Sequence, residues 1–185
     1  MSAFFRSSLR FFVLISLACS LVACSSTSTA GFETFQSNDG RYGFFYPTGW
    51  TRVALEGGPE VVFHDIINSD ETLSLVVSDV SEDIDLENIG TPAEVGERLM
   101  NNLLAPNGGE RQAELVNAKS REVDGRIFYD IEYVIHLNER DRHELATVVI
   151  DRGSLFTFAA GTNDVRWSKV DDLFQRVITS FRFLI

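Results

Sequence analysis

The chain has 185 residues and a formal net charge of −11, because 27 acidic side chains outnumber 16 basic ones. Such an acidic surface repels nucleic acid and anionic headgroups, so the composition argues against a DNA- or RNA-binding protein. Both cysteines fall within the first 24 residues, which leaves the rest of the chain without a thiol for a disulfide, a redox reaction or a cysteine zinc site.

The first residues have the layout of a bacterial lipoprotein signal peptide. Arg6 and Arg10 precede an uncharged apolar run that is too short to span a bilayer. That run ends at Ala23-Cys24, where we expect cleavage before Cys24 and lipidation of its thiol and new amino group. An ordinary signal peptide, with a cysteine there by chance, is the alternative.

This layout divides the chain into a signal peptide of residues 1–23, a lipidated tether of residues 24–31 and one domain of residues 32–185. After Cys24 no apolar stretch is long enough to cross a bilayer. We therefore expect an exported protein that is held to a membrane by acyl chains, because more than one chain makes such attachment stable.

Alternating apolar and polar residues predict a mainly antiparallel sheet. The clearest case is the run 126–137, in which every second residue from Ile127 to Leu137 is apolar or aromatic. Asp124-Gly125 and Asp151-Arg152-Gly153 are tight-turn signals that join neighbouring runs as hairpins. The expected strands are residues 42–46, 60–67, 73–77, 113–123, 126–137, 142–151 and 154–161.

Two segments predict amphipathic helices. Thr91-Pro92-Ala93-Glu94 is a capping box with proline at the first helical position, and this helix should end at residues 106–109. The second helix should run over residues 165–181, where apolar side chains recur at helical spacing. Helices packed on an antiparallel sheet give the α+β class. The acidic segment 79–87 lacks the spacing of a calcium loop, and we expect a solvated loop there.

The sequence contains no recognisable catalytic motif, so we expect a binding protein rather than an enzyme. His136 and His143 flank a turn. With a four-residue loop around residues 138–141 they would face each other, with Cβ atoms about 5 Å apart, and could share a zinc or copper ion. A register shift of one residue would send them to opposite faces. Asp164, just before the last helix, is either its N-cap or a metal ligand.

Stretches that follow one another in the same order along the chain resemble the PsbP family, the extrinsic proteins associated with photosystem II. They are residues 42–50 (YGFFYPTGW), 91–96 (TPAEVG), 125–133 (GRIFYDIEY), 142–146 (RHELA), 166–167 and 180–181. The resemblance implies an α-β-α sandwich with a central, mainly antiparallel sheet flanked by helices. It also implies a non-enzymatic monomer on the lumenal side of the thylakoid membrane, which aids the assembly or stability of photosystem II by binding its core subunits.

The resemblance further implies a metal site. The histidine and aspartate that the family is proposed to use match His143 and Asp164, whereas His136 has weaker support. The ion would be zinc or manganese, and a divalent-metal binding or delivery lipoprotein is the alternative function. Plant members use an N-terminal extension to retain calcium and chloride at the oxygen-evolving centre. Here only a short tether separates Cys24 from Phe32, so an accessory or assembly role is expected instead.

Overall fold

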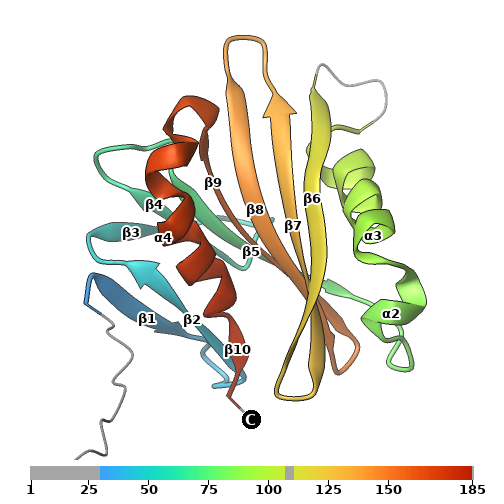
Figure 1. Cartoon of the computed structure of the whole chain (residues 1–185). Helices are drawn as coiled ribbons and strands as arrows, with labels where there is room; N and C mark the ends of the chain where they lie inside the picture. The colour runs from blue at the N-terminus through green and yellow to red at the C-terminus, as the bar shows by residue number, and fades with distance from the viewer. Residues whose placement is uncertain (1–29, 107–110, 185) are drawn as a thin grey trace, which may run out of the picture. The chain divides into compact units, whose positions relative to one another are not determined.

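The computed structural model describes residues 30–106 and 111–184, and these form a large sheet, a small sheet and flanking helices (Figure 1). The expected signal peptide and Cys24 lie outside the described residues. The large sheet is antiparallel throughout, in the order β3-β4-β5-β9-β8-β7-β6. Its strands are β3 (Trp50–Val53), β4 (Val61–Asp65), β5 (Thr72–Asp79), β6 (Gln112–Val123), β7 (Arg126–His136), β8 (Asp141–Asp151) and β9 (Ser154–Asn163).

Tight turns create the long hairpins of this sheet, as the sequence predicted. Asp124 and Gly125 have φ angles of 51° and 74°, and Arg152 and Gly153 have φ angles of 49° and 71°. Two successive residues with positive φ are what a two-residue hairpin turn requires, because that backbone matches the twist of the strands. The chain therefore reverses from β6 to β7 and from β8 to β9 without a long loop.

The small sheet has the order β1-β2-β10 and packs on one face of the large sheet. Its strands are β1 (Phe32–Gln36), β2 (Tyr42–Pro47) and β10 (Arg182–Phe183). Phe44 of β2 lies 4.3 Å from Phe158 of β9, measured between ring centroids, and both side chains are buried. Aromatic burial of this kind, at about 150–250 Å² for each ring, supplies much of the hydrophobic stabilisation.

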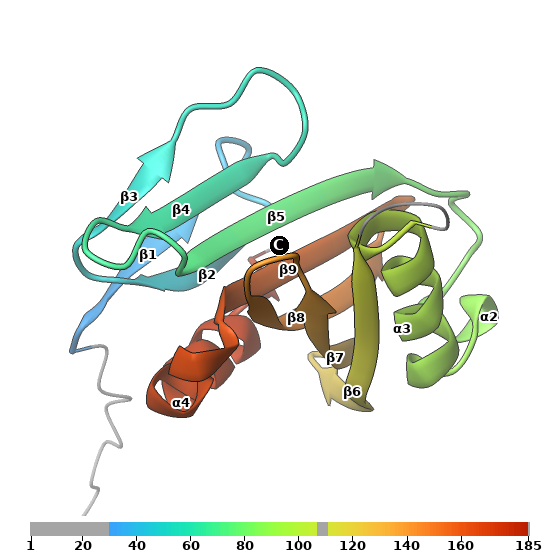
Figure 2. The same ribbon diagram turned by 90° about the horizontal axis from the view of Figure 1, so that it is seen from above.

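Helices cover both faces of the large sheet. On the face that carries the small sheet lies α4 (Trp167–Thr179), preceded by a 3₁₀ turn, η2 (Asp164–Arg166). On the other face lie α2 (Leu86–Ile89), α3 (Pro92–Leu99) and a π-helical turn, η1 (Met100–Leu104). Figure 2 shows β6, β7 and β8 between α4 and α3. The expected α+β class and α-β-α sandwich are confirmed.

The second helical layer lies very close to the sheet. An added Cβ at Gly96 of α3 would be only 3.0 Å from Ile131 Cγ2 on β7, so glycine permits this approach. The Tyr133 hydroxyl donates to the Gly96 carbonyl at 3.0 Å, which satisfies a buried polar group at the same contact. The predicted capping box of α3 is also present, since the Glu94 side chain accepts from the Thr91 backbone at 2.8 Å.

The short elements were not predicted. β1, β3, β10 and α2 have two to five residues each, too few for a periodic pattern to stand out. The two predicted helices exist, but the first continues as a π-helical turn from Met100 and the second opens with a 3₁₀ turn. Part of the segment expected as a solvated loop is ordered, because β5 reaches Asp79 and α2 begins at Leu86.

Candidate functional site

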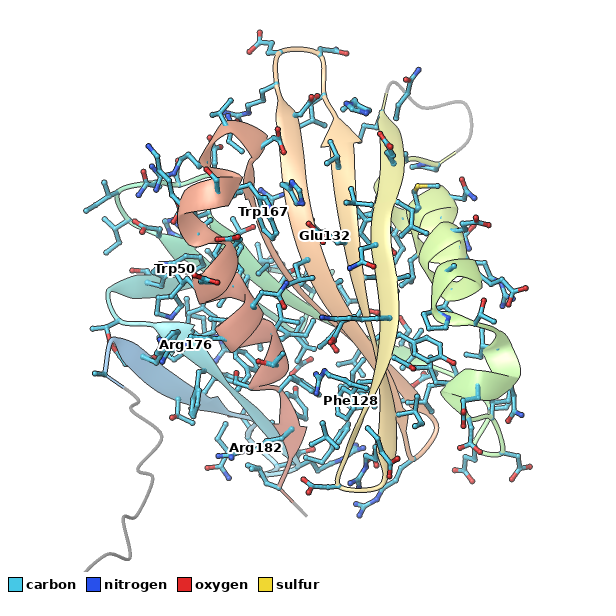
Figure 3. The ribbon with its side chains drawn as sticks, viewed as in Figure 1. Trp50, Phe128, Glu132, Trp167, Arg176 and Arg182 are labelled. Carbon is cyan, nitrogen blue, oxygen red and sulfur yellow. The ribbon has the colours of Figure 1, made fainter. Side chains whose placement is uncertain are left out.

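His143 is the centre of a polar cluster where β7, β8 and the start of α4 meet (Figure 3). Its Nδ1 lies 2.9 Å from Asp164 Oδ1 and its Nε2 lies 2.8 Å from Glu132 Oε1. The ring stacks on Trp167, with centroids 3.9 Å apart and planes at 5°. Only 7 % of His143 is exposed. We call His143, Glu132, Asp164 and Trp167 the His143 cluster.

The contacts of His143 fix what its ring is able to do. Both ring nitrogens lie within hydrogen-bonding distance of a carboxylate, so each is engaged in a contact inside the domain. The arrangement therefore joins β7 and β8 to the beginning of α4.

The predicted pairing of His136 with His143 across the hairpin is wrong. The loop consists of residues 137–140, so His136 lies opposite Asp141 and His143 lies opposite Val134. His136 Nδ1 contacts Asp141 Oδ1 at 3.0 Å, and both side chains are almost half exposed. The loop has the predicted length of four, but it begins one residue earlier than expected.

The structure does bring His143 and Asp164 together, as the resemblance implied. Asp164 is not the N-cap of α4, because Arg166 holds that position, and Asn163 caps the 3₁₀ turn η2 by accepting from the Val165 backbone. The donor set fits a metal ion only in part. Glu132 and Asp164 lie on opposite nitrogens of one ring, and within residues 30–106 and 111–184 there is no group of three or more candidate ligands able to hold an ion.

Sequence reasoning missed Glu132 and Trp167. Strand periodicity was the available signal for Glu132, because it shares a face of β7 with Val134, the partner of His143. Trp167 was expected as an apolar residue of the last helix and in the Arg166-Trp167 pair of the family resemblance, not as a partner of His143. Its stacking on His143 joins residues 24 positions apart, which no local pattern shows.

Beside the cluster, two arginines connect the turn between β4 and β5 to the start of β8 and to η2. Arg142 donates to the Asp70 carbonyl at 2.8 Å and to the Thr72 hydroxyl at 2.6 Å. Arg166 binds Glu71, of which only 3 % is exposed. Both guanidinium groups are therefore engaged in contacts inside the domain.

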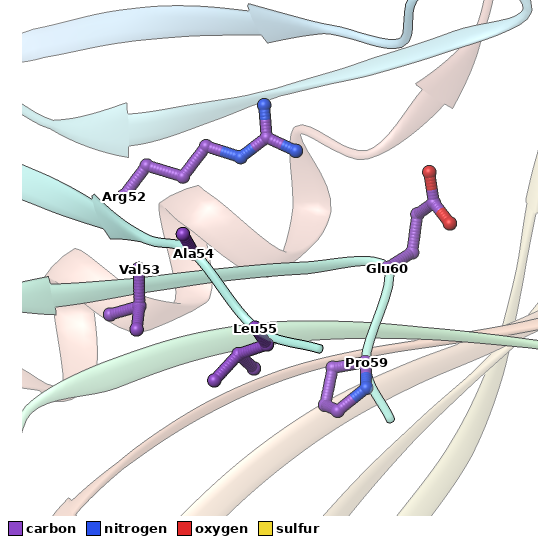
Figure 4. Close-up of a pocket in the computed structure, with 6 residues that line it drawn as sticks. All are labelled: Arg52, Val53, Ala54, Leu55, Pro59 and Glu60. Atoms are coloured by element: carbon purple, nitrogen blue, oxygen red, sulfur yellow. The ribbon is translucent and has the colours of Figure 1, made fainter. Parts of the chain in front are cut away.

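A hollow of about 430 Å³ lies beside β3 (Figure 4). It is lined by Arg52, Val53, Ala54, Leu55, Pro59 and Glu60. The hollow holds one cation and one anion on its rim but no histidine or nucleophile, so it supplies no catalytic arrangement. In the part of the chain that the structure describes, no helix is long and apolar enough to cross a membrane.

Comparison with known proteins assigns this chain to a family. The PsbP family model matches residues 30–183, nearly all of the described chain. The chain belongs to the PsbP family. CyanoP of Synechocystis sp. is 38 % identical over 173 residues, covering 91 % of this chain and 92 % of that protein. CyanoP of Thermosynechococcus vestitus is 36 % identical, covering 96 % of each chain. The chloroplastic PsbP-like protein 1 of Arabidopsis thaliana is 30 % identical, covering 87 % of this chain and 68 % of that protein.

Solved structures agree with this membership. The solution structure of cyanobacterial PsbP from Synechocystis sp. has a TM-score of 0.73 and 38 % identity, and covers 88 % of this chain and 98 % of that chain. LpqN of Mycobacterium tuberculosis has a TM-score of 0.54 and 14 % identity, covering 82 % of this chain and 90 % of that chain. At that identity the likeness shows the fold alone.

Proposed function

We propose that this chain is a lipid-anchored accessory protein of photosystem II on the lumenal side of the thylakoid membrane. Membership of the PsbP family supports an association with photosystem II and a location in the thylakoid lumen. We further propose that the protein acts as a monomer and aids assembly or stability by binding core subunits. The observation that carries the proposal is the family match over residues 30–183, together with CyanoP relatives of nearly equal length.

The geometry of the His143 cluster supports a role without catalysis. A catalytic histidine needs a free ring nitrogen near a reacting group, whereas both nitrogens of His143 contact carboxylates. The cluster therefore joins β7 and β8 to the start of α4.

Copurification tests the proposal. A tagged copy of the chain, expressed in a cyanobacterium that lacks its own CyanoP, should recover photosystem II core subunits from solubilised thylakoids. The same chain with Cys24→Ser should leave the membrane fraction while keeping its fold. Recovery of the wild-type chain only as free protein would contradict the proposed association.

Divalent-metal binding is a second candidate, favoured by the 2.9 Å contact between His143 Nδ1 and Asp164. A zinc or manganese ion between His143 Nδ1 and Asp164 would have two protein ligands, which predicts weak binding. Calorimetry of the wild type and of His143→Gln with zinc and with manganese tests it. Affinity that is absent, or only millimolar, would reject a function in metal delivery.

A further inference from the structure

The outward side of the small sheet combines aromatic rings with arginines. Side chains alternate along its strands, so Phe35 and Phe44 point into the core. Thr34 and Phe45 face each other on the opposite side, and Phe32, the next residue but one from Thr34, lies at its margin, where it also packs against the core. Arg182 of β10 lies opposite Gly43 and belongs to this side as well. Leu184, 40 % exposed, covers Gly43, since an added Cβ there would meet Leu184 Cδ1 at 3.5 Å.

Direct contacts connect these residues into one surface. The guanidinium carbon of Arg176, on α4, lies 4.5 Å from the Phe32 ring centroid. Phe32 and Phe45 are 6.3 Å apart, and the Arg182 guanidinium lies 5.9 Å from Phe45. Both rings are half-buried, whereas both arginines are exposed. Figure 3 labels Arg176 and Arg182, one on α4 and one in the strand that follows it. We call Phe32, Phe45, Arg176, Arg182 and Leu184 the aromatic–arginine face.

The composition of this face differs from that of the whole protein. The chain carries a net charge of −11, yet this face presents two guanidinium groups above phenyl rings. Arginine keeps its charge in any lumenal pH and extends over apolar surface with its head in water. Aromatic rings beside arginine heads suit the boundary between lipid headgroups and acyl chains.

The expected anchor is close to the same face. Cys24 precedes Phe32 by eight positions, and the residues between them are uncharged. Eight extended residues span at most about 26–29 Å, so a lipid on Cys24 keeps Phe32 within that distance of the bilayer. The chain as a whole carries a net charge of −11, which anionic headgroups repel, so a face that presents arginines beside aromatic rings is favoured at the membrane.

We propose that the aromatic–arginine face lies on the membrane surface and binds anionic lipid headgroups, so that it orients the anchored domain. This orientation rests on the proposed lipid anchor at Cys24. Acyl chains would provide the attachment, and the face would choose which side of the domain turns to the bilayer. The edge strand β6 and the outer side of α3 would then point away, toward protein partners in the lumen.

Fluorescence quenching from the bilayer tests this orientation on the full lipidated chain. The sequence has cysteine only at positions 19 and 24, so one introduced cysteine is a unique labelling site after lipidation. Thr34→Cys places a dye on the aromatic–arginine face. Ser120→Cys is the matched control, because it is also an exposed strand hydroxyl but lies on β6. In the large sheet, β6 is the edge strand three positions from β9, which contacts the small sheet through Phe158, and is therefore about 14 Å from it.

Both labelled proteins would be reconstituted into vesicles of anionic lipid with a nitroxide quencher on the headgroup. We expect strong quenching at Thr34, little at Ser120, and loss of the Thr34 quenching with Arg182→Glu but not with Lys119→Glu. Equal quenching at both positions, or stronger quenching at Ser120, would overturn the proposal and leave this face for a protein partner. Failure of the chain to sediment with vesicles would instead refute the lipid anchor itself, and the orientation with it.

Discussion

Replacing His143 with glutamine should destabilise the fold substantially, because the ring makes three contacts at once. The contact with Glu132, of which 18 % is exposed, is a charge-assisted hydrogen bond worth about 1.5–3 kcal/mol. Stacking on Trp167 adds about 0.5–1.5 kcal/mol. Asp164 is 45 % exposed, so its contact with His143 contributes at most about 0.5 kcal/mol. Glutamine retains one hydrogen bond, worth about 1 kcal/mol, so the expected loss in the free energy of unfolding is about 1–4 kcal/mol.

Urea unfolding followed by circular dichroism measures this loss, and thermal unfolding should show a decrease in Tm of roughly 5–15 °C. His136→Gln is the matched control, because His136 pairs with Asp141 in an exposed position on the same hairpin. We expect that control to change the free energy of unfolding by less than about 0.5 kcal/mol. Equal losses of unfolding free energy in the two variants would refute the conclusion that the contacts of His143 stabilise the fold.

Other residues give further tests of the fold. Burial raises the pKa of Tyr42 to about 12, whereas the unfolded phenol ionises near pH 10. As the pH rises, the unfolded chain therefore loses that proton first. The free energy of unfolding should fall by about 2–3 kcal/mol between pH 10 and 12, and urea titrations of Tyr42→Phe should show a smaller fall. Gly43→Ala should lower the free energy of unfolding by about 1–3 kcal/mol, because the new Cβ would be 2.8 Å from the Phe35 carbonyl oxygen. An unchanged midpoint of urea unfolding would contradict this contact. Asp130→Asn should lower the free energy of unfolding by about 3 kcal/mol, because it removes the buried carboxylate that pairs with Arg121. In a double-mutant cycle, adding Arg121→Met should recover part of this loss.

The long strands could be predicted from the sequence because their two faces differ in polarity over many residues. β7 sends Tyr129, Ile131 and Tyr133 to the α3 side, where they are buried, whereas Asp130 and Glu132 lie between them on the α4 side. This alternation gives the period of two that the sequence shows. By contrast, β10 is only two residues long and depends on pairing with Tyr42 and Gly43, far away in the sequence.

The candidate site was only partly predictable for a related reason. Family resemblance singled out His143 and Asp164, and the structure places them in contact. The pairing of His136 depended on where a four-residue loop begins, and a shift of one position changes every partner across the hairpin. Glu132 and Trp167 reach His143 only once β7, β8 and α4 have packed, so sequence spacing alone did not reveal them.

The most direct test of the account is crosslinking in isolated thylakoid membranes that contain the tagged chain, followed by identification of the crosslinked proteins. Wild type and Cys24→Ser would be compared at equal abundance. We predict crosslinks to photosystem II core subunits for the wild type, and strongly reduced crosslinking for Cys24→Ser, because the anchor raises the local concentration of the domain. Crosslinks to proteins unrelated to photosystem II, or equal crosslinking by both chains, would contradict a lipid-anchored accessory protein of photosystem II.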